Sequence, residues 1–156
     1  MPHIHEKIDF TTEVFIVHGS EVLLRKHDKY KLWLSVGGHV ELDEDPNQAA
    51  VREVKEEVGL DITLWDKHNE ARKFSDGTIG LIPPAFLNRN RISDLHEHVT
   101  FVYFATTSEK GVRQGKTEVS DELHWFTKQE LDSPQYDIRE NIKLYARAAL
   151  AALAKK

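Results

Sequence analysis

The stretch GHVELDEDPNQAAVREVKEEVGL, residues 38–60, decides most of what this sequence indicates about fold and function. Glu53, Glu56 and Glu57 are three and four residues apart, so on a helix their carboxylates converge on one face. Clustered carboxylates repel one another unless a cation lies among them. Hard divalent ions prefer oxygen ligands, and Mg²⁺ is the commonest one beside phosphates. The stretch therefore predicts a magnesium site, with a solvated acidic helix face as the alternative.

The same stretch contains the start and stop signals of a helix. Asp45 is a suitable N-cap with Pro46 at the first helical position, and Gly59 is a typical C-terminal stop. At 100° per residue, four apolar side chains fall within one arc of about 100°, separate from the glutamates. These are Ala50, Val51, Val54 and Val58. We expect this arc to pack on a sheet.

Residues 38–60 also resemble the Nudix (MutT-like) hydrolase box. Gly38 is followed after five residues by Glu44, and after seven more by REVKEEVGL at residues 52–60, which fills every defined position of that box. The segments 32–41 and 120–126 resemble the family as well. The resemblance covers most of the chain. It implies an α+β or α/β fold, an α/β/α sandwich with a mixed β-sheet between helices.

The resemblance implies a set of metal ligands. Glu53, Glu56 and Glu57 would hold the ion, joined by the backbone carbonyl of Gly37. Mg²⁺ is the expected ion, with Mn²⁺ as a substitute. Beside a diphosphate, such an ion neutralises the phosphoryl oxygens, acidifies a bound water and aligns the attack. One of the glutamates, or a carboxylate from a later loop, would take the proton from that water.

Further residues around the box are candidates for supporting roles. Arg52 is expected to orient Glu53 through a bidentate pair. The resemblance implies a supporting role for Glu44 near the junction of loop and helix. Gly37–Gly38 has no Cβ atoms, which allows the backbone to approach a metal or a phosphate closely. Arg25, on an earlier predicted strand, is a candidate phosphate contact.

A second polar segment lies at residues 96–98. Several family members supply an extra metal-binding or base carboxylate near this point, so Glu97 is a candidate for that role. Glu118 and Glu122 are its rivals. His96 and His98 lie two apart and would share one face of a strand, as in a zinc-binding pair. The alternative, which we favour, is a polar start of a strand.

Composition narrows the class of protein and its partners. A chain of 156 residues predicts one domain, residues 1–156. A net charge of −5 argues against a nucleic-acid partner. The absence of cysteine excludes disulfides, thiolate zinc sites and cysteine nucleophiles. Neither a signal peptide nor an apolar run of about 18 residues is recognisable, so no membrane contact and a cytoplasmic location are expected.

The remaining pattern predicts the order of the elements. Gly37–Gly38 is expected to end the third strand, residues 66–95 to be rich in loops, and a C-terminal helix to cover about 136–155. Strands are expected at residues 12–18, 22–26, 32–36, 62–65, 98–106 and 123–126.

We predict a metal-dependent hydrolase that cleaves the diphosphate bond of a nucleoside diphosphate linked to another group. A nucleoside triphosphate is the first choice of substrate, and ADP-ribose or a nucleotide sugar is the alternative. The proline that marks ADP-ribose enzymes downstream of the box has no match at its expected place. Gly77 stands where dinucleoside polyphosphate enzymes have tyrosine. A non-catalytic nucleotide-binding module and a His-rich zinc protein are competing hypotheses. The sequence leaves a homodimer open.

Overall fold

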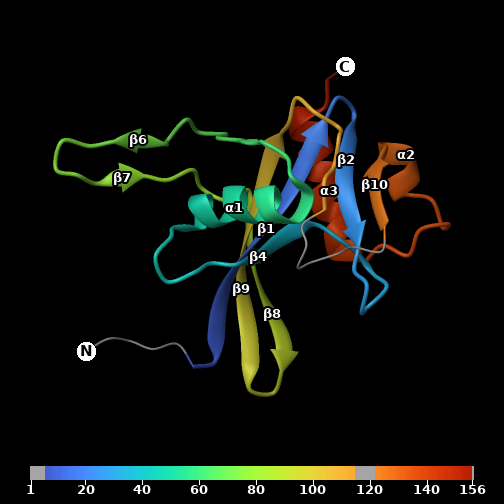
Figure 1. Ribbon diagram of the computed structural model, residues 1–156, viewed down its shortest axis with the longest axis horizontal. Coiled ribbons are helices and arrows are strands. Elements are labelled where there is room, and N and C mark those ends of the chain that lie inside the picture. The colour runs from blue at the N-terminus through green and yellow to red at the C-terminus, as the bar shows by residue number, and fades with distance from the viewer. Residues whose placement is uncertain (1–5, 115–121, 156) are drawn as a thin grey trace.

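A computed structural model describes residues 6–114 and 122–155 of the chain (Figure 1). The helices are α1 (Pro46–Val58), α2 (Lys128–Leu131) and α3 (Glu140–Leu153). No helix within the described ranges is long and apolar enough to cross a membrane. The strands are β1 (Ile8–His18), β2 (Glu21–Lys26), β3 (Trp33–Leu34), β4 (Val36–His39), β5 (Thr63–Leu64), β6 (Arg72–Lys73), β7 (Ile79–Gly80), β8 (Phe86–Ser93), β9 (His96–Thr106) and β10 (Glu122–Phe126).

Eight strands of the described part form one mixed sheet around β1. β1 runs parallel to β9, and it pairs antiparallel with β2 and β4. The order is β10-β2-β1-β9-β5, with β3 beside β2, β4 beside β1 and β8 beside β9. β6 and β7 form a separate hairpin that projects away from the sheet (Figure 1). The long parallel β1–β9 pairing makes these two strands the centre of the molecule.

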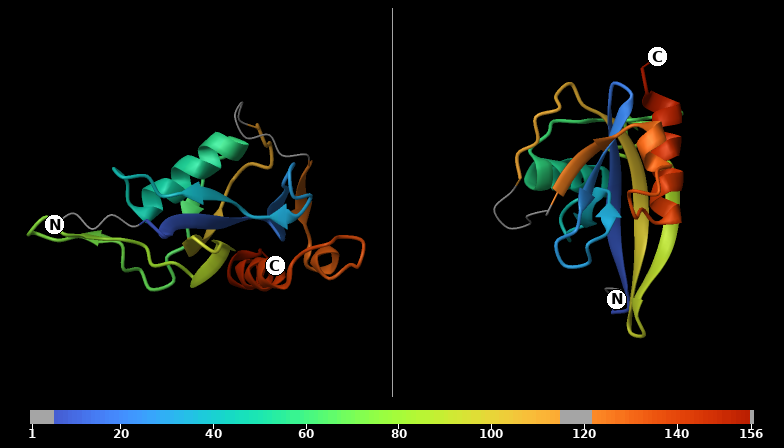
Figure 2. Two further views of the ribbon diagram at one scale, coloured as in Figure 1. Left: turned by 90° about the horizontal axis from the view of Figure 1, so that it is seen from below. Right: turned by 90° about the vertical axis from the view of Figure 1, so that its right-hand side faces the viewer.

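The sheet is covered by helices on both faces, with α1 on one side and α3 on the other (Figure 2). Successive side chains of a strand point to opposite faces, so β1 contributes to both layers. Val14 and Ile16 pack in one cluster with Val54 of α1. Phe15 packs in the cluster on the opposite face. Its ring lies edge to face with that of Tyr145 of α3, with 5.8 Å between the ring centroids. The predicted α/β/α sandwich with a mixed sheet is confirmed.

Helix α1 begins and ends where its local signals predict. The Asp45 side chain accepts a hydrogen bond from the Gln48 backbone, and the Gln48 side chain accepts one from the Asp45 backbone, both at 2.9 Å. Pro46 occupies the first turn. At the other end Gly59 adopts φ 72°, and its N–H donates to Lys55 O. Such caps satisfy the backbone groups that a helix leaves unpaired at its ends.

The predicted apolar arc of α1 is wrong at one position. Val51 is 44% exposed, whereas Ala50, Val54 and Val58 are fully buried. Ala49 is buried in its place. The contact face is therefore rotated toward Ala49, because the sheet meets the helix on that side and leaves Val51 at its solvent edge.

The glycine pair does not end the third strand as predicted. That strand is divided into β3 and β4, and Gly37–Gly38 lies inside β4. Gly37 has φ 157°, and a Cβ atom on it would lie 2.0 Å from Thr12 O. Only a residue without a side chain fits so close to the neighbouring strand.

The segment 66–95 contains more regular structure than predicted. It holds the β6–β7 hairpin and the eight-residue strand β8, which pairs with β9. Most side chains of β8 are exposed, so it lacks the apolar alternation that marks a strand in a sequence. Helix α3 begins at Glu140, later than the predicted residue 136.

Replacement of Gly37 by alanine tests the close β1–β4 approach. We expect Gly37→Ala to lower the free energy of unfolding by about 2–4 kcal/mol, because the new Cβ collides with backbone and strains φ. Gly111→Ala is the matched control, since nothing lies within 4 Å of a Cβ at that position. Urea denaturation in metal-free buffer measures both. Equal stability of the two variants would contradict the geometry at Gly37.

Candidate functional site

The three glutamates of α1 line the same pocket, and their role as metal ligands stays a prediction. Glu53, Glu56 and Glu57 line one pocket of about 290 Å³, together with Gly38 and Glu41. Their surroundings differ, since the side chains of Glu53 and Glu57 are 12% and 3% exposed and that of Glu56 is 60% exposed. The pocket thus has two sheltered carboxylates and one that faces solvent.

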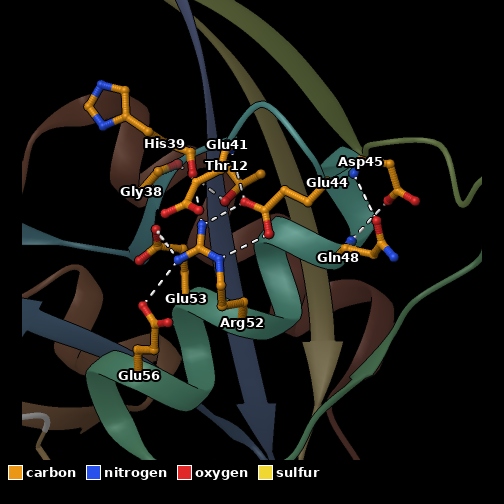
Figure 3. A network of polar contacts seen from close by, with 10 residues as sticks. All are labelled: Thr12, Gly38, His39, Glu41, Glu44, Asp45, Gln48, Arg52, Glu53 and Glu56. Carbon is orange, nitrogen blue, oxygen red and sulfur yellow. Dashed lines mark hydrogen bonds and ion pairs between the residues drawn. The ribbon is translucent and has the colours of Figure 1, made fainter.

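Arg52 holds the acidic face together (Figure 3). Its Nε and Nη2 donate to both oxygens of Glu44 at 2.9 and 2.6 Å. Its Nη1 donates to Glu53 and to Glu56, each at 3.0 Å, and Nη2 also donates to His39 O at 3.0 Å. The hydrogen bonds from Arg52 lower the pKa of Glu44, and the bond with Glu44 is the largest cause that raises the pKa of Arg52.

The predicted bidentate partner of Arg52 is corrected by this geometry. Glu44, not Glu53, receives the two-pronged contact, and Arg52 reaches Glu53 through Nη1. Glu44 lies in the loop before α1, where both of its oxygens face the planar guanidinium. Glu53 follows Arg52 directly and so projects about 100° further round the helix.

Gly38 lies directly against the carboxylate of Glu53. A Cβ atom on Gly38 would lie 2.5 Å from Glu53 Oε1 and 2.6 Å from its Cδ. The Thr12 hydroxyl donates to Gly38 O at 3.5 Å. The glycine therefore makes room for a carboxylate of the pocket, and its predicted contact with substrate stays a prediction.

Glu57 points inward and meets β2 and β4. Its Oε2 accepts from the Gly37 N–H at 3.3 Å and lies 3.4 Å from Arg25 Nε. Arg25 Nε also donates to Ser35 O at 3.3 Å. Arg25, predicted to contact phosphate, is thus paired with a glutamate of the pocket, while it also lines a larger cleft. Its role toward phosphate stays a prediction.

A polar cleft of about 630 Å³ meets the glutamate pocket at Gly38 and His39, which line both. The cleft extends over the β1 face that also carries α3. Its polar lining comes from several elements and includes Glu13, Asn90, Thr100, Arg139 and Asn141. The sequence reasoning missed this cleft because its residues are far apart in the chain.

Glu13 is the least expected residue of the cleft. Burial raises the pKa of its carboxyl group from 4.5 to about 7. Its Oε2 atom is buried and has no hydrogen-bond partner among the described residues. The sequence analysis missed Glu13, although a charged residue within the apolar run of β1 is a signal that could have revealed it.

Two of the three candidates for an additional carboxylate are described, and neither lines the glutamate pocket. Glu97 in β9 is 3.6 Å from Lys7 Nζ and 3.7 Å from Arg89 Nε, and it is not among the residues that line the glutamate pocket. Glu122 is exposed in β10. Glu118 lies outside the described residues. Metal binding by Glu97 stays a prediction.

The donors of the glutamate pocket fit a hard divalent cation. Glu53, Glu56 and Glu57 offer only oxygen atoms, which Mg²⁺ and Mn²⁺ prefer over nitrogen or sulfur. The missing Cβ of Gly38 keeps one side of the pocket open to backbone atoms. An ion there would meet three negative charges, of which Arg52 compensates only part.

Comparisons with known proteins agree with this geometry. A family model described as NUDIX domain matches residues 8–148. The crystal structure of a hydrolase of the NUDIX family from Clostridium perfringens is 36% identical, covers 96% of this chain and 99% of that chain, and superposes with a TM-score of 0.85. The crystal structure of a MutT NUDIX hydrolase from Burkholderia pseudomallei is 22% identical and covers 96% of this chain and 100% of that chain. Its TM-score of 0.63 shows the shared fold.

A curated relative matches over a shorter range. Human diphosphoinositol polyphosphate phosphohydrolase 2 is 34% identical over 90 residues, which are 57% of this chain and 39% of that protein. The chain therefore spans about two fifths of the length of this relative.

The raised pKa of Glu13 predicts a pH-dependent loss of stability. Between pH 4.5 and 7 the folded protein keeps a proton that the unfolded chain releases, so stability falls as the pH rises through this window. From pH 5 to pH 8 we expect the wild type to lose about 2–3 kcal/mol relative to Glu13→Gln. Urea unfolding at both pH values measures this loss, with Glu109→Gln, at an exposed site, as control. Parallel pH profiles of wild type and Glu13→Gln would refute the assignment.

Proposed function

This chain belongs to the Nudix hydrolase family, and on that premise we propose that it is a Mg²⁺-dependent pyrophosphohydrolase. It cleaves the diphosphate bond of a nucleoside diphosphate linked to another group. A nucleoside triphosphate is the substrate class that we place first, giving the monophosphate and pyrophosphate. The observation that carries this proposal is the convergence of three glutamates in one pocket beside a larger polar cleft.

The glutamate pocket is the proposed catalytic centre. Glu53, Glu56 and Glu57 would hold Mg²⁺, or Mn²⁺ as a substitute, with the carbonyl of Gly37 as a further ligand. When bound, the ion neutralises phosphoryl oxygens and acidifies a water molecule. One of the three glutamates accepts the proton of the attacking water, and the exposed position of Glu56 gives water direct access to that carboxylate.

Arg52 and Arg25 position these carboxylates. The Nη1 of Arg52 donates a hydrogen bond to both Glu53 and Glu56, which fixes the direction of the two carboxylates. Arg25 performs the same task for Glu57. Neither arginine needs to touch the substrate to support the reaction, although Arg25 also lines the cleft and is placed to meet a phosphate group.

The polar cleft is the proposed site of the nucleoside. Its volume of about 630 Å³ lies within the range usual for small-molecule sites. It meets the glutamate pocket at Gly38, so a ligand in the cleft can extend its phosphates toward the carboxylates. Glu13 and Asn90 supply polar groups for the edge of a base. With a pKa of about 7, Glu13 can offer either a proton or a lone pair.

Two alternatives remain for the same site. ADP-ribose or a nucleotide sugar would place its second group beyond the diphosphate and keep the same chemistry. A non-catalytic nucleotide-binding module would use the cleft without turnover. The curated relative named as a diphosphoinositol polyphosphate phosphohydrolase adds one more diphosphate compound to the substrates worth testing.

Substitution of the glutamates tests the catalytic centre. The purified protein is incubated with Mg²⁺ and a panel of nucleoside triphosphates, ADP-ribose, nucleotide sugars and a diphosphoinositol polyphosphate, and released phosphate is measured after coupling enzymes. We expect Glu53→Gln, Glu56→Gln and Glu57→Gln each to lower kcat about 10²–10⁴-fold, because each removes a negative oxygen from the pocket.

Glu109→Gln, at an exposed position outside both pockets, is the matched control and should retain full turnover. Turnover that survives in all three pocket variants would overturn the catalytic assignment. Tight nucleotide binding by the wild type without any turnover would favour the binding module instead.

A further inference from the structure

A cluster of three histidines and one aspartate lies beside the glutamate pocket, where His39 lines both the pocket and the cleft and His98 lines the cleft. Its members come from three strands, and we call them the histidine cluster: Asp9 of β1, His39 of β4, and His96 and His98 of β9. Each offers one ligand atom, and these four atoms all lie within 4.8 Å of one another. Residues from three strands thus converge on one point.

The register of the sheet explains this convergence. Asp9 is the direct partner of His98, and Thr11 is the partner of His39. Partners in register point to the same face, and residues two apart on a strand share that face. The sequence showed only the His96–His98 pair, for which a polar strand start was favoured, because the other two members are brought in by long-range pairing.

Three separations between ligand atoms of the cluster are close to those around a tetrahedral ion, and the other pairs lie within 4.8 Å. Asp9 Oδ2 lies 3.3 Å from His96 Nε2 and 3.6 Å from His39 Nε2. The Nε2 atoms of His96 and His98 are 3.1 Å apart. For a tetrahedral zinc ion with bonds of about 2.0–2.1 Å, the ligand atoms are about 3.3–3.4 Å from one another. The three observed separations bracket that value.

The cluster is open to ions from solution, and none of its four ligands is a glutamate of α1. The side chains of His39 and Asp9 are 58% and 43% exposed. Residues of β1 with the parity of Asp9, such as Phe15, face α3, whereas the glutamates belong to α1 on the other face. In Figure 3 the ring of His39 is turned away from Glu53 and Arg52.

The two sites differ in the chemistry of their donors. The histidine cluster offers three imidazole nitrogens and one carboxylate, a set that suits zinc-type ions. The glutamate pocket offers oxygen atoms alone, which suit Mg²⁺. Nitrogen ligands therefore discriminate against Mg²⁺. A zinc-type ion is expected to prefer the histidine cluster, and Mg²⁺ is expected to prefer the glutamate pocket.

We propose that the histidine cluster is a second metal site, which binds one zinc-type divalent ion independently of the glutamate pocket. The ion ties β1, β4 and β9 together at one end of the sheet. Because His39 directly follows Gly38, the ion also fixes the end of the strand whose glycine lies against Glu53. The site is a structural clamp on the backbone beside the glutamate pocket.

Calorimetric titration with Zn²⁺ tests this site. The full chain, without a polyhistidine tag and stripped with a chelator, should bind one Zn²⁺ in millimolar Mg²⁺, which occupies the glutamate pocket in its place. We expect His96→Ala with His98→Ala to weaken binding about 100-fold or more, since half of the ligands are lost. With Co²⁺ as a probe, the visible absorption of a tetrahedral ion should appear in the wild type and vanish in this double variant.

Two double variants serve as matched controls. His3→Ala with His5→Ala removes the other His-x-His pair of the sequence at the same spacing. Glu53→Gln with Glu56→Gln weakens the glutamate pocket. Both should bind Zn²⁺ as the wild type does. Zinc affinity that survives loss of His96 and His98, or that is lost in either control, would overturn the proposal.

Thermal unfolding guards against a variant that fails to fold. At free Zn²⁺ 100 times the dissociation constant, the folded-to-unfolded ratio of the wild type should rise about 100-fold, and the melting temperature should rise with it. His39→Ala, at an exposed side chain, should fold and lose most of that rise. An equal rise in wild type and His39→Ala would remove His39 from the site.

Discussion

The pairing of Arg52 with several acceptors is the constraint on which the acidic face depends. One guanidinium reaches three carboxylates and the carbonyl of His39 at 2.6–3.0 Å. Without it, Glu44, Glu53 and Glu56 would repel one another. Arginine suits this task better than lysine because its planar fork has five donors in fixed directions. The contacts also tie the loop before α1 to the helix, so the protein's own side chains hold the pocket together.

Three consecutive residues of β4 serve both faces of the sheet. Gly37 allows close pairing with Thr12, and Gly38 leaves room for the carboxylate of Glu53. His39 turns its ring to the opposite face while its carbonyl accepts from Arg52. Alternation along one strand thus puts an oxygen-lined pocket and a nitrogen-rich cluster back to back. Any movement of β4 would therefore change the geometry of both the glutamate pocket and the histidine cluster.

The sequence predicted what is local and missed what is long-range. The caps of α1 and the convergence of its glutamates involve residues within a few turns, so spacing alone reveals them. The cleft depends on pairing of β8 with β9, and β8 carries no apolar alternation. Asp9 and His98 are partners only because β1 and β9 run parallel in register, which no local pattern encodes. The two-pronged contact of Arg52 with Glu44 was also not predicted, because it depends on the conformation of the loop before α1.

The burial of the Glu13 carboxyl group lowers the stability of the protein, and the fold alone does not explain why the group is there. Burial without a partner for Oε2 raises the pKa to about 7, which means that ionisation is opposed by its surroundings. A glutamine or an apolar residue would remove this penalty from the centre of β1. Groups with strongly shifted pKa values are concentrated at functional sites, because binding and catalysis use such groups even though they lower the stability of the fold. Under the proposed function, Glu13 would recognise a ligand in the cleft through this oxygen, and the long, regular β1–β9 pairing around it would compensate for the cost.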